Sequence, residues 1–181
     1  MKVPDQRPPA ANFEDLAMPL FDQLYNFAHW LTQDTAEAED LVQETFAKAL
    51  RGFSSFQAGT NFRAWMYRIL RNSFLSSRTG LKTTVVFDEE DQETAPSTEG
   101  TTPESLLIAQ ATRETVQRAM EELPVHFREI LLLCEVEEMS YQEIADTLAI
   151  PTGTVMSRLF RARKALRGLL APKLQGGPDG V

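Results

Sequence analysis

Basic side chains gather in two stretches of this 181-residue chain from which acidic residues are missing. Between positions 147 and 178 there are six Lys or Arg residues, between positions 45 and 87 there are seven, and neither stretch contains Asp or Glu. Such stretches can bind nucleic acids, because guanidinium and ammonium groups bond to phosphates and base edges. The rest of the chain brings the formal net charge to −8. This segregation predicts two local nucleic-acid contacts on a protein whose overall affinity for DNA is weak.

The second basic stretch belongs to a predicted helix-turn-helix at residues 139–170, MSYQEIADTLAIPTGTVMSRLFRARKALRGLL. Ser140 and Glu143 have the spacing of a capping box, which begins the first helix. Pro151 ends that helix, and Thr152 is expected to be the N-cap of the second. Apolar residues of the second helix recur at i, i+4, i+7 and i+11, which places them on one buried stripe: Val155, Leu159, Ala162 and Leu166.

The opposite side of this second helix is polar and basic. The residues expected to project from it are Ser157, Phe160, Arg161 and Lys164, with Thr152 at its N-terminal end. Such a face suits contacts with phosphates and base edges in a DNA major groove. The alternative is a solvated cationic helix at the end of an ordinary bundle. DNA binding is favoured, because the cap, the turn, the apolar stripe and a face that carries only positive charges all agree with it.

The first basic stretch combines arginines with aromatic residues. Residues 53–62, FSSFQAGTNF, contain Gly59 and small polar residues and are expected to form a loop, which a predicted helix then follows. The polar side of that helix carries Arg63, Arg68, Arg71, Asn72 and Arg78. Bases stack on aromatic rings while guanidinium groups hold the backbone, so the pattern suits single-stranded nucleic acid. The alternative is that Trp65, Tyr67 and Phe74 are core residues.

The N-terminal part is predicted to contain two further helices. Residues 12–32 have apolar residues at mixed three- and four-residue spacing, with an irregularity at Pro19. Residues 34–51 have acids in the first turns and bases in the last, as the helix dipole favours. In this second helix Leu41, Phe46 and Leu50 are expected to face the core. The side left for solvent or a partner carries Glu37, Asp40, Gln43 and Glu44.

The expected fold is all-α, with two small helical domains at residues 1–80 and 104–175. Residues 81–103 are rich in acid, Thr, Ser and Pro, and are read as a flexible linker; residues 176–181 are read as a disordered tail. In the second domain a helix is expected from about residue 103 to Pro124. Another helix, at residues 125–138, is expected to pack beneath the helix-turn-helix and to bury Cys134.

Signals for catalysis, metal binding and membrane insertion are missing from the sequence. His29 and His126 are the only histidines, and no phosphate loop or G-x-S-x-G motif occurs. We therefore expect no enzyme activity, no catalytic residues, no cofactor and no metal. The single cysteine excludes an intramolecular disulfide. There is neither an apolar run of about 20 residues nor a signal-peptide core, so we expect a cytoplasmic protein without membrane insertion.

With these elements placed, the chain resembles bacterial RNA polymerase sigma factors of the extracytoplasmic-function (ECF) group in the sigma-70 family. These factors direct promoter-specific transcription initiation with two helical domains, called region 2 and region 4, on a flexible tether. The segment EAEDLVQETFAKAL resembles the family helix that docks on the clamp coiled coil of the polymerase largest subunit. The resemblance implies these core-binding positions: Asp40, Leu41, Gln43, Glu44 and Phe46.

The two basic stretches resemble the promoter-binding parts of the same family. Residues 56–62 and the segment FRAWMYRILRN resemble the part that recognises and opens the −10 element, which implies a site made of Phe56, Phe62, Arg63, Trp65, Arg68, Arg71 and Asn72. PTGTVMSRLFRARKAL resembles the −35 recognition helix, which implies Thr152, Thr154, Ser157, Phe160, Arg161 and Lys164. Two departures are Met156, where many members have a basic residue, and Ser76, which replaces a common acidic one.

The resemblance also implies partners: the core polymerase through its clamp helices and flap, promoter DNA, and an anti-sigma factor. One rival is a response regulator whose sigma-like domain binds an anti-sigma factor without reading DNA. That rival predicts a degenerate recognition helix and a receiver domain, and this chain has neither the loss of basic residues nor the length. The other rival is an enzyme, and the sequence contains no catalytic motif that would support it.

Overall fold

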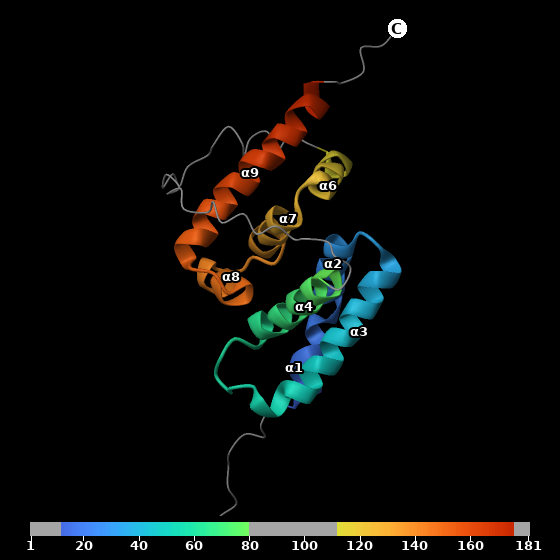
Figure 1. Cartoon of the computed structure of the whole chain (residues 1–181), viewed down its shortest axis with the longest axis vertical. Helices are drawn as coiled ribbons and strands as arrows, with labels where there is room; N and C mark the ends of the chain where they lie inside the picture. The colour runs from blue at the N-terminus through green and yellow to red at the C-terminus, as the bar shows by residue number, and fades with distance from the viewer. Residues whose placement is uncertain (1–11, 80–111, 176–181) are drawn as a thin grey trace, which may run out of the picture.

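The computed structural model describes residues 12–79 and 112–175, and the described part is helical without strands (Figure 1). The N-terminal domain contains α1 (Phe13–Ala17), η1 (Met18–Leu20), α2 (Phe21–Thr32), α3 (Thr35–Gly52), η2 (Phe53–Ser55) and α4 (Phe62–Thr79). The C-terminal domain contains α6 (Arg113–Glu122), α7 (Val125–Leu131), the π-helical turn η3 (Leu132–Val136), α8 (Tyr141–Leu148) and α9 (Thr152–Gln175). The expected all-α fold is confirmed, while the expected linker and tail lie outside the described residues.

Polar caps begin the N-terminal helices where the sequence places them. The side chain of Asn12 accepts a hydrogen bond from the Asp15 amide at 2.8 Å, and that of Asp34 accepts one from Glu37 at 2.9 Å. Each satisfies an amide that the helix cannot pair internally. The irregularity expected at Pro19 is the 3₁₀ turn η1 between α1 and α2.

The core of the N-terminal domain lies between α2, α3 and α4. Its buried apolar side chains are Leu24, Phe27, Ala28, Leu31, Ala38, Leu41, Val42, Ala49, Met66, Tyr67, Leu70 and Phe74. The core reading of Tyr67 and Phe74 is therefore correct. The expectation that Leu50 faces this core is wrong, because its side chain is 60% exposed. Thr45 and Ala49 occupy the inward positions of α3 instead.

The helix-turn-helix forms as predicted. The Ser140 hydroxyl accepts from the Glu143 amide, and the Glu143 carboxylate accepts from the Ser140 amide at 2.7 Å, so the capping box is complete. All four residues of the predicted α9 stripe are buried: Val155, Leu159, Ala162 and Leu166. The N-cap was misplaced by one residue, since the carbonyl of Pro151 accepts the first helical bond from Val155 at 3.1 Å.

The helices before the helix-turn-helix differ in detail from expectation. Helix α6 is described from Arg113, after the cap residue Thr112, and its expected start near residue 103 lies outside the described residues. The single helix expected at residues 125–138 is α-helical only to Leu131 and then widens into η3. Cys134, expected to be buried, is half-buried.

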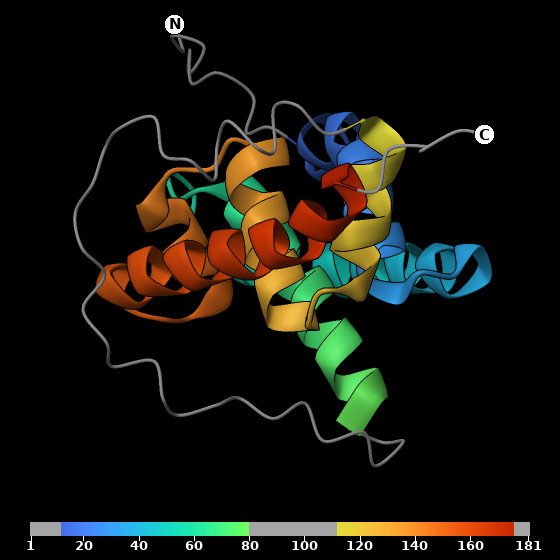
Figure 2. The ribbon, with the colours of Figure 1, turned by 90° about the horizontal axis from the view of Figure 1, so that it is seen from above.

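The two domains pack directly against each other. Helix α4 contacts α8, and α2 contacts α7. Figure 1 shows α4 lying under α7 and α8, and Figure 2, from above, shows α7 crossing between α9 and the N-terminal helices. The interface therefore places the helix expected to read the −10 element beside the helix-turn-helix domain.

Candidate nucleic-acid interface

The exposed side of α9 displays an aromatic and basic surface. Thr152, Phe160 and Lys164 are exposed, with Phe160 at 43%, while Thr154 and Arg161 are half-buried. Met156, which departs from the resemblance, is 41% exposed on the same helix. Because Thr152 lies at the first turn, backbone amides without helical partners lie beside it, at one end of this surface. This surface can contact phosphates and base edges together.

Ser157 does not lie on that exposed surface as expected. Its side chain is 5% exposed, and its hydroxyl donates to the carbonyl of Thr154 at 3.1 Å. At about 100° per residue, position 157 lies on the opposite side of α9 from the buried Val155 and Leu159. Its side chain is therefore covered outside the apolar stripe, on the side that the sequence predicted to be open. A direct role in reading DNA would require this position to be uncovered.

The basic residues of α9 fall into different environments. Arg163 binds the Glu135 carboxylate at 2.6 Å, so its charge is already paired inside the domain. Arg158 is buried; burial lowers the pKa of its guanidinium, while the neighbouring Glu129 opposes this effect. Lys164 is exposed and Arg161 is half-buried. Among the basic residues 158–164, Lys164 is therefore the one whose side chain is open to solvent, and Arg161 lies half-buried near it.

The aromatic residues expected at the −10 site form one cluster at the start of α4. Ring centroids are 5.0 Å apart for Phe56 and Trp65, 5.5 Å for Phe62 and Trp65, and 5.3 Å for Phe56 and Phe62. All three are half-buried. Their packing shapes the exposed turn at residues 57–60, where Gly59 has a φ of 90° that favours glycine.

Sequence reasoning missed two members of this aromatic cluster. Phe53 lies 5.5 Å from Phe13 and 6.2 Å from Phe56, in a stacked arrangement with the latter. Phe13 comes from α1, so the cluster fastens the beginning of the domain under the loop. The repeated phenylalanines of FSSFQAGTNF were the available signal, but their spacing does not reveal the contact with α1.

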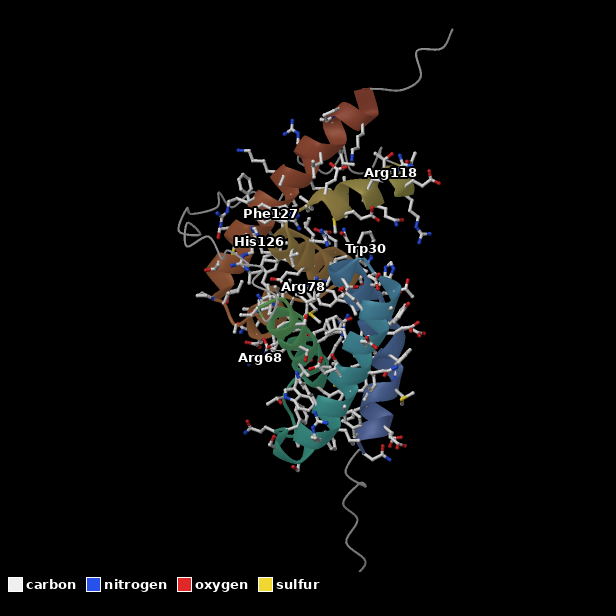
Figure 3. The ribbon with its side chains drawn as sticks, turned by 45° about the vertical axis from the view of Figure 1, so that its right-hand side comes forward. Trp30, Arg68, Arg78, Arg118, His126 and Phe127 are labelled. Atoms are coloured by element: carbon white, nitrogen blue, oxygen red, sulfur yellow. The ribbon has the colours of Figure 1, made fainter. Side chains whose placement is uncertain are left out.

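The polar residues of α4 divide into an open and a covered set. Arg68 and Asn72 are exposed one turn apart, and Figure 3 shows Arg68 on the open side of the helix. Arg63 and Arg71 instead bind carboxylates of the C-terminal domain. The expectation of a continuous exposed polar side is therefore wrong for Arg71, whose side chain is 8% exposed.

The acidic side of α3 is open. Asp40, Gln43 and Glu44 are exposed, and Glu44 pairs with Lys48 at 2.5 Å within the helix. Leu41, one of the expected core-binding positions, is buried inside the domain. Phe46 is half-buried, so it is the aromatic member of the expected set that reaches this surface.

An apolar patch that the sequence did not predict adjoins the acidic side of α3. The Phe46 ring lies 5.7 Å from that of Phe21, and Leu50 follows Phe46 by one helical turn. Phe21, Leu50 and Met18 are exposed. Apolar side chains grouped beside charged ones are typical of protein-binding surfaces. The signal was the i, i+4 spacing of Phe46 and Leu50, which periodicity assigned to the core.

Within residues 12–79 and 112–175, no group of three or more His, Cys, Asp or Glu side chains could hold a metal ion. His29 and His126 each lie beside an aromatic ring. Burial raises the pKa of the Cys134 thiol, which keeps it in its unreactive form. No helix in the described ranges is long and apolar enough to cross a membrane.

Known families match both domains. The Sigma-70 region 2 profile matches residues 16–83, and the Sigma-70, region 4 profile matches residues 113–166. The ECF RNA polymerase sigma factor SigW of Bacillus subtilis is 31% identical over 162 residues, which cover 86% of this chain and 87% of that one. The chain belongs to the ECF sigma factors of the sigma-70 family. It is therefore a member of the proteins that direct promoter-specific transcription initiation.

Two further relatives agree with this membership. The ECF sigma factor SigE of Mycolicibacterium smegmatis is 35% identical over 161 residues, covering 88% of this chain, which spans 62% of the length of SigE. The solved structure of the sigma factor RpoE from Bartonella quintana, in complex with the anti-sigma factor NepR, has a TM-score of 0.66 and 31% identity. That similarity covers 87% of this ECF sigma factor and 98% of RpoE.

Proposed function

We propose that the two domains of this ECF sigma factor share the work of initiation. Region 4 reads the −35 element through the exposed side of α9, and region 2 recognises and opens the −10 element through the aromatic loop and α4. The observation that carries the −35 assignment is the surface formed by Thr152, Phe160 and Lys164 beside half-buried Arg161. A major groove admits one helix, and this side of α9 carries the groups that contact bases and phosphates.

The −10 assignment rests on the aromatic cluster and the open polar residues of α4. Phe56, Phe62 and Trp65 support the exposed turn at residues 57–60, and Arg68 and Asn72 lie on the helix that follows. Rings that are only half-buried leave faces for stacking with unpaired bases. A base that leaves the duplex is recognised through hydrogen bonds to its edge, and the Asn72 amide both donates and accepts.

Core polymerase is proposed to bind the acidic side of α3 together with the neighbouring apolar patch. Asp40, Gln43 and Glu44 are exposed there, next to Phe46. A charged rim around an apolar centre is the usual composition of a protein interface. The RpoE structure contains an anti-sigma factor, and we propose that an anti-sigma factor also holds this chain, in the cytoplasm where polymerase works.

The core-binding proposal is tested by the paired substitution Asp40→Lys with Glu44→Lys. We expect affinity for core polymerase, measured by pull-down and by run-off transcription, to fall at least about tenfold, since like charges would now oppose the partner. The matched control is Glu114→Lys with Glu138→Lys, which makes the same charge change at exposed sites of the C-terminal domain. Equal losses in both variants would contradict binding through α3.

A further inference from the structure

The first turns of α9 present an exposed face that carries no charge. Between its first residue, Thr152, and Phe160, the other exposed residues are Gly153 and Met156. Met156 and Phe160 are 41% and 43% exposed and lie four residues apart, so they are neighbours on one side of the helix. The first exposed basic residue of α9 is Lys164, about three turns from the helix start. Exposed apolar side chains that are grouped rather than scattered mark a binding surface.

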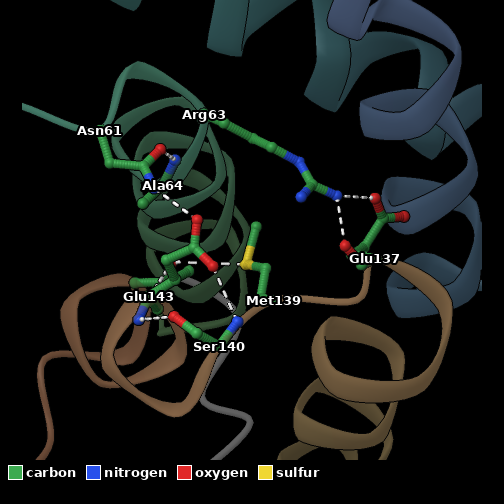
Figure 4. Close-up of polar contacts among 8 residues, drawn as sticks. Asn61, Arg63, Ala64, Glu137, Met139, Ser140 and Glu143 are labelled. Atoms are coloured by element: carbon green, nitrogen blue, oxygen red, sulfur yellow. Dashed lines mark hydrogen bonds and ion pairs between the residues drawn. The ribbon is translucent and has the colours of Figure 1, made fainter.

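The helix that carries Met156 is positioned by α8 and by the turn between the two helices. The capping box of Ser140 and Glu143 begins α8, and Figure 4 shows the Glu143 carboxylate beside the Ser140 amide. Helix α8 ends at Ala149, which has a left-handed φ of 56°, and the amide of Ile150 then donates to the carbonyl of Ala145 at 3.1 Å. Both ends of the helix before the turn are therefore defined by hydrogen bonds. A side chain at the start of α9 is held on a rigid element, as the reading of a single base requires.

The chemistry of Met156 limits what it can read in a DNA groove. A recognition helix enters the major groove with its N-terminal residues, and these contact the base edges. Met156 belongs to that part of α9, whereas Lys164 lies about 12 Å further along the helix axis. A thioether carries no charge, has no hydrogen to donate and accepts only weakly. The group in the major groove that suits such a side chain is the C5-methyl of thymine.

The surroundings of Met156 leave room for this contact. Gly153 lies three residues before Met156 on the same side of α9, and the space where a Cβ would stand has no side chain within 4 Å apart from those of its chain neighbours. The backbone beside Met156 is therefore open to a base. Methionine is unbranched and polarisable, so its side chain adapts to the shape of an apolar partner. Phe160 extends the apolar face by one helical turn.

We propose that Met156 reads a thymine in the −35 element through its C5-methyl group, with Phe160 completing the apolar contact. This inference rests on the proposed −35 role of α9. A guanidinium or ammonium at position 156 would instead bond to N7 and O6 of guanine. Promoters selected by this sigma factor therefore carry a T·A pair where a relative with a basic residue at this position selects G·C.

The test removes single methyl groups from the DNA. A promoter is first selected with the holoenzyme from a pool randomised over the −35 region, and each of its −35 thymines, on either strand, is then replaced by uracil. Holoenzyme containing the wild-type chain should lose affinity about fourfold at one of these positions, as expected for the burial of one methyl group. Met156→Ala should bind thymine and uracil equally at that position. A wild-type holoenzyme indifferent to uracil at every position would overturn the contact.

Three more variants separate an apolar contact from a merely structural role. Met156→Leu keeps the apolar character and should retain the difference between thymine and uracil, whereas Met156→Gln has nearly the same length and should lose it. Met156→Arg should move the preference at this base pair from T·A to G·C. Because position 156 is exposed, all these variants should keep the wild-type melting temperature. A difference between thymine and uracil that is equal in wild type, Met156→Ala and Met156→Gln would assign the methyl contact to another residue and overturn the inference.

A promoter with a scrambled −35 element distinguishes failure of this inference from failure of the proposed function. If scrambling leaves the affinity of the holoenzyme unchanged, the element is not read, and both the −35 role of α9 and the Met156 contact are wrong. If scrambling weakens binding but no uracil effect depends on position 156, the −35 role stands and the Met156 contact alone is overturned.

Discussion

Arg161 and Arg163 lie two residues apart on α9, yet their surroundings differ. Arg163 is bound to Glu135, with nitrogen–oxygen distances of 3.1 and 2.6 Å, and also lies near the Cys134 thiol. Arg161 is half-buried on the side that carries Phe160 and Lys164. The sequence shows two equivalent charges here, whereas in the structure Glu135 holds Arg163, and Arg161 lies half-buried on the side of α9 proposed to face DNA.

Replacing Arg161 by Ala is expected to change the reading of one base pair in the −35 element. A guanidinium bonded to a guanine edge contributes about 1–3 kcal/mol of discrimination, and its loss should relax preference at that position. Affinities of holoenzyme for all single-base variants of the element provide the measurement. Arg163→Ala is the matched control and should leave the preference intact. An equal loss on every variant would make Arg161 a phosphate contact.

Replacing Asn72 by Ala is expected to impair opening of the −10 element. The amide is exposed on α4, and loss of its hydrogen bonds to an extruded base should reduce strand opening roughly tenfold while polymerase binding stays intact. Permanganate reactivity near the start site measures opening. Ser76→Ala, an exposed change one turn further along α4, serves as the control. Unchanged opening in Asn72→Ala would remove this residue from the site.

At the scale of elements, the sequence predicted the helix caps and breaks, which depend on residues close together in the chain. The Ser140–Glu143 capping box, the Asp34 cap and the break at Pro19 all involve groups within a few residues of one another, so their spacing is decisive. Leu50 is exposed where the core was expected, and Ser157 is covered where solvent was expected, because periodicity gives a helical angle but does not say which neighbour covers it. The Arg71–Glu129 pair joins residues 58 positions apart, and no local pattern identifies such a partner.

The start of α8 should make stability depend on pH. The backbone amide of Ser140 bonds to the Glu143 carboxylate, and this contact, helped by Asn61, lowers the pKa of Glu143. The folded pKa lies below the unfolded value of about 4.3, so the stabilisation is complete above that pH and is lost as pH falls through the folded pKa. Glu143→Gln should remove this contribution.

Urea unfolding at a series of pH values measures the effect. The free energy of unfolding of the wild type should fall more steeply in acid than that of Glu143→Gln, and the two curves should differ most at neutral pH. Glu138→Gln, a nearby exposed substitution, should behave like the wild type in this comparison. Parallel curves for all three proteins would show that the Glu143 carboxylate does not stabilise α8.

At the scale of the whole molecule, the negative net charge and the packing of the two domains both weaken the binding of DNA by the free chain. The chain has a formal net charge of −8, and two of the arginines expected at the −10 site are bound to carboxylates of the other domain. DNA affinity grows with the number of phosphates neutralised, so few available cations mean weak binding at physiological salt. Polymerase would hold both domains at the spacing of a promoter, which raises the effective concentration of the second contact once the first has formed.

The free full-length chain is therefore expected to bind a promoter duplex poorly, and core polymerase should convert it into a tight and sequence-specific complex. Gel shifts with and without core, at several salt concentrations, measure the conversion. The slope of log affinity against log salt should be steeper for the holoenzyme, because more phosphates are contacted. The core-binding substitutions Asp40→Lys and Glu44→Lys should prevent the conversion and leave the weak binding of the free chain no weaker. Tight, specific binding by the free chain that is indifferent to these substitutions would mean that the protein reads DNA by itself, as a repressor does, and that polymerase is not required to assemble the two sites.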